Sequence, residues 1–588
     1  MKRTALLVAT PLAGGLAILM ANATSAPAQP GIDAEALFKE RCATCHEPAT
    51  ERAPTRADMA QRPVAQLVDI MTNGPMAPMA AGLSAGQIQA LAAHLGVKPV
   101  TAPPPETPAR GGVPAAAAGG RGRGGGAEAA DGAQRPSTYN PKLTEVACAT
   151  HPAIAMTPTS WSSWGIDERN TRFQRNPGLK ASDVPKLKVK WAFSYPGGSY
   201  GQPIVVGDHL FMTSRGGTMY ALDAKSGCVH WKVENLVSRT TPMVVKSDLS
   251  PSGWVTFVGD RTRVVHAIDA STGKTIWKSG VLDDHRSAGI TGSPIYYNGQ
   301  LFVPLTSGEE GAGTAPNYQC CSFRGSLVAL DAKSGQQQWK QYVITEPLRP
   351  IRKNSAGTQL QGPAGGAIWS APTIDPKRGL VLVATGDSYI DAPTTGADAI
   401  IAYDIKTGKE KWRNQVTEND DFIVGCTRVQ KPINCSAKPG PDYDFGSPPI
   451  VMKLKNGKDV VISGQKSGIV YGMDPDTGKL LWKTQVGNGS SLGGVEWGMA
   501  ADDTYVYVPN SDLVALMEVQ NRAQGKPSLD DRFHVVPKPG LTAINPANGK
   551  VAWHVAGVKS PCKWFGDRSR DRAIGCFEAH SAAATVIP

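Results

Sequence analysis

The clearest chemical motif of the chain is a pair of cysteines followed directly by a histidine, in the segment Cys42-Ala-Thr-Cys45-His46. Two thiols at this spacing form thioether bonds to the vinyl groups of haem, and the adjacent histidine then supplies one axial nitrogen to the iron. The motif therefore predicts covalently bound haem c, attached at Cys42 and Cys45, with His46 as an iron ligand.

The second axial ligand is expected to be a methionine ahead of the last helix of this region. Met76 and Met79 are the candidates, in a segment that resembles the Gly-x-Met-Pro loop of small cytochromes c. In that loop the ligand stands seven residues before the Leu-Ser that opens the helix, here Leu83-Ser84, and this spacing selects Met76. Met79 remains the alternative, and His94 is expected on the surface of the helix.

Two helices are predicted to build the haem pocket. Residues 32–40 have helical spacing, and residues 84–95 place apolar side chains on one face before Gly96, which is a stop signal. We therefore assign residues 31–98 to a small all-α cytochrome c domain. The Pro, Ala, Gly and Arg stretch of residues 99–140 lacks the large apolar side chains that a core needs, so it is predicted to be a flexible linker.

The N-terminus predicts export. Lys2 and Arg3 precede an apolar run and small residues ending near Ala28, which is the pattern of a cleaved signal peptide over residues 1–28. An uncleaved membrane anchor is the alternative. The mature protein is therefore expected in the periplasm, without stable membrane insertion, where disulfide bonds can form.

The rest of the chain carries a repeat: a small residue, an apolar residue, Asp, two variable residues, Thr or Ser, Gly, three residues, then Trp. The copies run from Asp223 to Trp231, Asp269 to Trp277, Asp331 to Trp339, Asp404 to Trp412, Asp474 to Trp482 and, with Asn in place of Asp and of Thr, from Asn545 to Trp553. Each copy predicts a strand, a turn capped by the Asp with Gly at positive φ, and a strand whose Trp packs between neighbouring sheets. Repeats of this length and pattern indicate a β-propeller.

Eight cysteines remain beyond the haem motif, and an even number in an exported protein favours disulfides. Proximity in sequence pairs Cys426 with Cys435, Cys562 with Cys576, and the adjacent Cys320 with Cys321. Cys148 and Cys228 are what is left, although the sequence alone does not fix this connectivity.

The repeats resemble the tryptophan-docking motifs of the quinoprotein alcohol dehydrogenases, over about residues 160 to 588. The resemblance implies an all-β, eight-bladed propeller, assigned to residues 145–588, and pyrroloquinoline quinone as a cofactor. The chain has only six motifs and ends in a segment similar to the first strand of another blade, residues 582–588. We therefore expect about one blade or more to be missing at the C-terminus.

The resemblance also assigns the quinone site. Trp369, after a Gly-Gly stretch, falls where the family has the tryptophan that stacks on the quinone, and Lys466 falls where a basic side chain reaches the quinone oxygens. Arg239 and Thr291 fall where the family has further contacts, and Trp497 falls in another pocket segment. For Lys466, Arg239, Thr291 and Trp497, ordinary packing within a blade is an equal alternative.

Acidic residues at family positions predict a metal and a base. Asp387, in a Gly-Asp turn, and Glu310, in a Ser-Gly-x-Glu stretch, match the calcium ligands, and hard carboxylate oxygens suit Ca²⁺. Asp444 matches the catalytic base, although Tyr443 replaces the family's Trp before it. Solvated loop acids are the alternative for Asp387 and Glu310, and a common Asp-rich turn is the alternative for Asp444.

Two departures from the family pattern concern the same site. The family has adjacent, disulfide-bonded cysteines that cover the quinone, whereas Cys320-Cys321 lies one blade later, after the Glu309-Glu310 loop. An early glutamate that contacts the quinone in the family is Tyr200 here.

The expected activity is oxidation of an alcohol by the quinone, with electrons passing through haem c to an external cytochrome c or similar acceptor. A haem domain ahead of the propeller is similar to family members that act on polyvinyl alcohol, which implies oxidation of secondary hydroxyls of a polymer to ketones. The alternatives are a dehydrogenase of small alcohols and a non-catalytic propeller scaffold. The net charge is +11, but no basic stripe is interleaved with aromatic residues, so nucleic acid is not an expected partner.

Overall fold

The protein is described here from a computed structural model. It describes residues 33–46, 55–60, 62, 64–72, 76, 79–80, 83–96, 145–426, 431–523, 525, 535–558 and 578–588. The chain divides into two compact units, Met1–Ala117 and Ala118–Pro588. The predicted signal peptide, the linker and the Cys562–Cys576 pair lie outside the described residues, and the domain limits drawn from the sequence stay predictions.

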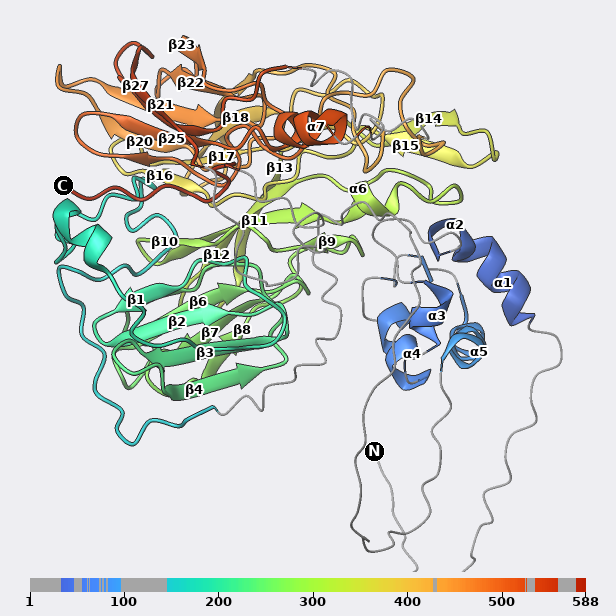
Figure 1. The fold of residues 1–588 in the computed structure, drawn as a ribbon, viewed down its shortest axis with the longest axis horizontal. Helices are drawn as coiled ribbons and strands as arrows, with labels where there is room; N and C mark the ends of the chain where they lie inside the picture. Colours follow the sequence, from blue (N-terminus) through green and yellow to red (C-terminus); the bar gives the residue numbers. More distant parts are fainter. Residues whose placement is uncertain are drawn as a thin grey trace, which may run out of the picture. The chain divides into compact units, whose positions relative to one another are not determined.

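The first unit is helical (Figure 1). Its helices are α1 (Ala34–Arg41), α2 (Ala43–His46), α3 (Arg56–Met59), α4 (Val64–Thr72) and α5 (Ala85–Leu95). Ser84 caps α5 by accepting a hydrogen bond from the backbone N–H of Gln87, whose side chain accepts one from the N–H of Ser84. These reciprocal bonds satisfy two N–H groups that a helix start otherwise leaves unpaired. Both predicted helices are confirmed within about two residues.

The second unit contains six successive antiparallel sheets built on four strands each (Figure 1). The strands are β1 (Ile204–Val206), β2 (His209–Thr213), β3 (Thr218–Asp223), β4 (Val229–Glu234); β5 (Met243–Lys246), β6 (Trp254–Gly259), β7 (Val265–Asp269), β8 (Thr275–Lys278); β10 (Ile295–Tyr297), β11 (Gln300–Ser307), β12 (Ser326–Asp331), β13 (Gln337–Tyr342); β16 (Thr373–Asp375), β17 (Leu380–Ala384), β18 (Ala399–Asp404), β19 (Glu410–Gln415); β20 (Ile450–Lys453), β21 (Asp459–Gly464), β22 (Ile469–Met473), β23 (Leu480–Gln485); and β24 (Ala500–Ala501), β25 (Val506–Asn510), β26 (Gly540–Ile544), β27 (Val551–Ala556). Additional elements are β9 (Ala288–Gly289), β14 (Arg349–Lys353), β15 (Gln359–Gly362), a 3₁₀ helix (Ala181–Lys186), α6 (Glu309–Ala312) and α7 (Leu513–Ala523).

The tryptophans of the repeat connect each sheet to the next. Trp231 donates a hydrogen bond from Nε1 to the carbonyl of Ala270 at 2.9 Å. Ala270 directly follows the Asp of the next copy of the repeat. The same bond recurs with Ala332, Ile405, Pro475 and Pro546 as acceptors. Trp191, which belongs to none of the six copies, bonds to Ala224 in this way and was missed from the sequence. The predicted packing of tryptophan between sheets is confirmed, and it defines a propeller.

The glycine of each copy makes this docking possible. Gly408 has a φ of +68°, and a Cβ built there would lie 2.7 Å from the indole of Trp339. A Cβ built at Gly273, Gly335 or Gly478 would lie similarly close to the indole of the preceding tryptophan. Glycine is therefore required twice over, for the left-handed backbone and for the space that the ring occupies.

The strand order gives every sheet two distinct ends. The docking turn joins the third strand to the fourth and lies beside the hairpin between the first two, as the pairing of His209 with Asp223 shows. The start of the first strand and the end of the second strand lie at the opposite end, which we call the loop end. Every residue predicted for the quinone and metal site lies in a loop-end segment.

Three predicted disulfides are present: Cys148–Cys228, Cys320–Cys321 and Cys426–Cys435. Six sheets built on four strands are described, besides the two-stranded β14–β15 sheet, so the expected count of eight blades stays a prediction. The segment predicted to begin another blade makes one parallel bridge, between Val586 and Phe173, and no strand. Among the described helices, none is both long and apolar enough to cross a membrane.

Candidate active site

A pocket at the loop end collects the residues predicted to contact the quinone. Its lining consists of Trp164, Tyr200, Arg239, Thr241, Thr291, Gly292, Ser293, Trp369, Ser370, Ala371, Gly446, Pro448 and Trp497. Arg239, Thr291, Trp369 and Trp497 are four of the five residues assigned to the quinone. They come from segments before β5, β10, β16 and β24, so residues distant in sequence converge because each precedes the first strand of its sheet.

The pocket offers flat aromatic surfaces next to a cation. Trp369 and Trp497 meet edge to face, with ring centroids 5.4 Å apart. The guanidinium of Arg239 lies 4.7 Å from the ring centroid of Tyr200 and 5.9 Å from that of Trp497. A planar, anionic aromatic ligand suits such a lining, because it can stack on an indole and pair its charge with Arg239.

Lys466, the fifth residue, connects this pocket to a buried acidic cluster. Its Nζ lies 5.5 Å from the ring centroid of Trp369. The same nitrogen donates to Asp442 at 2.7 Å and to Asp444 at 2.8 Å. Burial opposes the charged amine, but the carboxylates of Asp442 and Asp444 outweigh it, so the pKa of Lys466 is raised well above its ordinary value.

Asp387, Asp442 and Asp444 form the acidic cluster, with one carboxylate oxygen of each within 4.8 Å of the others. Burial, followed by the charges of Asp444 and Glu310, raises the pKa of Asp387 well above its ordinary value. Its Oδ2 atom is buried and has no hydrogen-bond partner. Several carboxylates facing a single lysine leave buried negative charge uncompensated, and this donor set of hard oxygens fits a divalent cation such as Ca²⁺.

The backbone holds the cluster in place. Asp387 donates its own N–H to Asp444 at 2.6 Å, which fixes the turn after β17 against the segment before β20. Asp420 accepts the backbone N–H groups of Asp442 and Tyr443 at 2.8 and 2.7 Å. Asp442 has a φ of +62°, so this turn needs such external support.

Asp442 is the site residue that the sequence reasoning missed. A signal was present, because side chains two positions apart in an extended segment point to the same side. Asp442 and Asp444 have this spacing, and Lys466 binds both.

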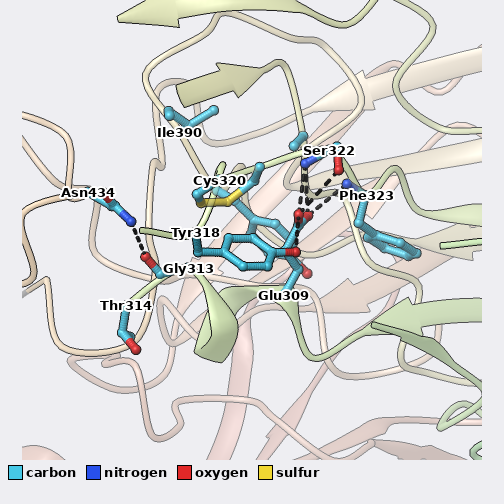
Figure 2. Close-up of a disulfide and its surroundings, with 12 residues drawn as sticks. Glu309, Gly313, Thr314, Tyr318, Cys320, Ser322, Phe323, Ile390 and Asn434 are labelled. Carbon is cyan, nitrogen blue, oxygen red and sulfur yellow. Dashed lines mark hydrogen bonds between the residues drawn. A yellow bond between two sulfur atoms is a disulfide. The ribbon is translucent and has the colours of Figure 1, made fainter. Parts of the chain in front are cut away.

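The adjacent glutamates after β11 have different surroundings. Glu309 is fully buried, and its carboxylate accepts hydrogen bonds from the backbone N–H groups of Ser322 and Phe323 and from the hydroxyl of Tyr318 (Figure 2). Glu310 is only partly buried, and its charge raises the pKa of Asp387. The carboxylate of Glu309 is therefore held by the protein itself, and Glu310 as a calcium ligand stays a prediction.

The adjacent disulfide lies in an apolar cluster that contacts one residue of the pocket lining. Cys320 and Cys321 are buried in an apolar cluster with Phe323 and Tyr389, and Trp369 packs against that cluster. Figure 2 shows the disulfide beside the Glu309 bonds that hold the following residues. The pair therefore belongs to the same wall as the expected stacking residue, despite its displacement by one blade.

In the helical unit, His46 is 6% exposed and its ring centroid lies 6.5 Å from that of Phe38. Cys42 and Met76 pack at the edge of the same core, which includes Leu91 and Leu95. The Cys45 side chain lies outside the described part of the structure. His94 bonds to Glu35 at 2.8 Å in an exposed contact, which confirms its expected place on the helix surface. Met76 as the iron ligand stays a prediction.

Sequence comparisons agree with these two units. Residues 161–424 match the family described as glucose/ethanol/alcohol dehydrogenase, beta-propeller domain. Residues 30–95 match a family described as cytochrome C oxidase, cbb3-type, subunit III, and residues 466–569 match one described as outer membrane protein assembly factor BamB. The crystal structure of quinohemoprotein alcohol dehydrogenase from Comamonas testosteroni resembles the chain with a TM-score of 0.50 at 20% identity, covering 69% of this chain and 68% of that one.

The propeller and the cytochrome c unit together define a quinohaemoprotein alcohol dehydrogenase, with pyrroloquinoline quinone and haem c as its cofactors. The chain is 43% identical to a polyvinylalcohol dehydrogenase from Pseudomonas sp, over 98% of this chain and 83% of that protein. It is 37% identical to a polyvinylalcohol dehydrogenase from Sphingopyxis sp. (strain 113P3), over 95% and 79%. The chain belongs to the polyvinylalcohol dehydrogenase family.

Proposed function

We propose that the protein oxidises secondary hydroxyl groups of polyvinyl alcohol to ketones, using the loop-end pocket as its active site. The observation that carries the proposal is the meeting of the aromatic pocket and the acidic cluster at Lys466, which contacts both. The close similarity to two polyvinylalcohol dehydrogenases supports the choice of substrate. When bound, pyrroloquinoline quinone accepts the two electrons of the alcohol oxidation, and haem c carries electrons onward singly.

The residues of the site take distinct roles in this proposal. Trp369 supplies the surface on which the planar cofactor stacks, and Arg239, Thr291 and Trp497 orient it from the pocket lining. Asp444 takes the proton of the substrate hydroxyl as general base. Lys466 holds the Asp444 carboxylate in place at 2.8 Å.

The acidic cluster is proposed to hold Ca²⁺ through Asp387 and Glu310. Asp442 is a further ligand candidate, because an oxygen of its carboxylate lies within 4.8 Å of those of Asp387 and Asp444. A cation there would satisfy the unpartnered Oδ2 of Asp387 and stabilise the ionised form of the cluster.

Electrons leave through the helical unit in this proposal. Cys42 and Cys45 hold the haem, and His46 with Met76 ligates its iron. We propose an external cytochrome c or a similar acceptor as the partner, and the periplasm as the location of the mature protein.

The test follows haem reduction in the full-length protein loaded with haem c, quinone and Ca²⁺. Polyvinyl alcohol is expected to reduce the haem only when both quinone and Ca²⁺ are present, and Asp444→Asn is expected to abolish this reduction. Asp503→Asn is a matched control, because Asp503 pairs with Arg175 on the surface.

The substrate is tested in parallel samples. Reduction by a small primary alcohol but not by the polymer would retain the mechanism and replace the substrate with small alcohols. If neither alcohol reduces the haem of the loaded parent protein, the proposed activity is wrong.

A further inference from the structure

Three histidines gather at the docking-turn end of the first sheet, away from the proposed active site. His209 begins β2, His230 lies on β4, and His151 lies in the segment ahead of the first sheet. The Nδ1 atoms of His151 and His230 are 3.3 Å apart. The rings of His209 and His230 stack with centroids 4.5 Å apart.

The separation of the two Nδ1 atoms fits a shared metal ion. Two nitrogens bound at about 2.0–2.1 Å to a tetrahedral zinc ion lie about 3.3 Å from each other. A hydrogen bond is the alternative, but N–H···O bonds in proteins are commonly about 2.7–3.2 Å long, so the contact between His151 and His230 lies at the long end.

The third histidine, His209, is enclosed behind this pair. His209 is 2% exposed and its Nδ1 is buried without a hydrogen-bond partner, as is Nε2 of His230. These two nitrogens are not the Nδ1 atoms of His151 and His230 that face each other, so they mark the enclosed side of the cluster. The proposal is carried by the separation of the facing Nδ1 atoms.

The surroundings hold His151 in place while leaving it accessible. Residues 146–148 run beside β4, with Cys148 donating its backbone N–H to Val229 at 3.0 Å, and the Cys148–Cys228 disulfide fixes the same segment. His151 itself is exposed, so an ion can reach it from solvent. Asp208 and Asp223 both favour a positive charge near His209.

This cluster is distinct from the acidic site. His209 and Thr213 are the two ends of β2, and Thr213 bonds to Thr240, next to pocket residue Thr241. Four residue steps along a strand span about 13 Å. Nitrogen ligands also favour different ions from those that carboxylate oxygens favour.

We propose that His151 and His230 bind a divalent transition-metal ion such as Zn²⁺ through their Nδ1 atoms. The stacked ring of His209 supports His230 from behind, and water completes the coordination. The ion connects the segment that enters the propeller to the fourth strand of its first sheet. It is a second cross-link there, in addition to the Cys148–Cys228 disulfide.

The test uses the full-length protein carrying haem c and quinone, with excess Ca²⁺ to occupy the acidic site. Zn²⁺ binding is measured by equilibrium dialysis with metal analysis. One equivalent is expected in the parent protein, with Zn²⁺ affinity lowered at least about tenfold in His151→Asn and in His230→Asn. Asparagine keeps a hydrogen-bonding group near the Nδ1 position, so these variants separate metal binding from a hydrogen bond.

His554→Asn is the matched control, because His554 bonds to Thr542 on another sheet. It is expected to bind Zn²⁺ like the parent protein. Zinc is also expected to raise the unfolding temperature of the parent but not of His151→Asn, a variant that changes only an exposed side chain. Equal zinc binding by parent and His151→Asn, or no zinc binding by the parent, would overturn the proposal. Neither measurement depends on alcohol oxidation, so the proposed activity can fail independently.

Discussion

The adjacent glutamates Glu309 and Glu310 allow a sharp test of how the active-site wall is built. Replacing Glu309 with Gln keeps the shape of the side chain but exchanges one acceptor oxygen for an amide donor. Oε2 of Glu309 now accepts from the N–H groups of Phe323 at 2.7 Å and Ser322 at 3.0 Å. Oε1 accepts from Tyr318 and Ser322, both at 2.9 Å.

The introduced side-chain amide would meet N–H or O–H donors on either side, whichever way it is turned. At least two charge-assisted hydrogen bonds are weakened or lost, and each contributes about 1.5–3 kcal/mol. We therefore expect Glu309→Gln to lower the free energy of unfolding of the propeller by about 3–6 kcal/mol. Glu310→Gln should lower it by less, because removing this charge relieves its repulsion of the buried Asp387 carboxyl.

The assay is urea denaturation of calcium-free protein, with tryptophan fluorescence reporting the propeller and haem absorbance reporting the helical unit. Calcium affinity is then measured by titration. Glu310→Gln should weaken it at least about tenfold, because it removes a charged ligand. The reasoning is refuted if Glu309→Gln is as stable as the parent protein, or if Glu310→Gln binds calcium with unchanged affinity.

Three further outcomes are expected. Asp444→Asn should abolish turnover while leaving quinone binding, measured by absorbance titration, within about threefold of the parent, because the cofactor contacts lie on other residues. In thermal unfolding, Gly408→Ala should destabilise the propeller by at least about 2 kcal/mol more than Gly457→Ala. Both glycines have positive φ, but only Gly408 faces an indole. Equal losses of stability would show that the docking contact contributes nothing. In metal-free protein, the unfolding midpoint of the parent should fall relative to that of His209→Phe as the pH drops from 6.5 towards 4, because the unfolded parent binds a proton that buried His209, with its pKa lowered to about 4, does not. The comparison with His209→Phe removes the opposite contribution of the buried carboxyls, and a constant difference between the two proteins would contradict the role of burial.

The propeller could be predicted from its sequence because the contacts that form each turn lie within a few residues of one another. Each Asp-x-x-Thr-Gly turn is complete within a few residues: Asp404 accepts the backbone N–H groups of Lys406 and Thr407 and the Thr407 hydroxyl. The tryptophan follows at fixed spacing, so its docking could be inferred as well. Trp191 was missed because its own segment carries no such turn, and only the first copy supplies its partner.

The site was predictable only in part. Convergence of Trp369 and Lys466 followed from the family resemblance, since nothing in their own segments places them 5.5 Å apart. The two-residue spacing of Asp442 and Asp444 indicated that they share a side, but the turn that Asp420 holds could not be inferred from that spacing. The histidine cluster had no local signal either, because only strand pairing and the disulfide bring its members together.

The separation of docking turns from loop ends has a consequence for how such enzymes diversify. The turns space the sheets through short, repetitive contacts at one end, while the residues of the pocket and the acidic cluster stand in segments at the other. Long connections such as residues 308–325 and 385–398 therefore extend the loop end, while β11 still pairs with β12, and β17 with β18, in continuous register. Selection can change the loop-end segments one at a time, to suit a long polymer or a small alcohol, while the sheets that support the site keep their docking contacts.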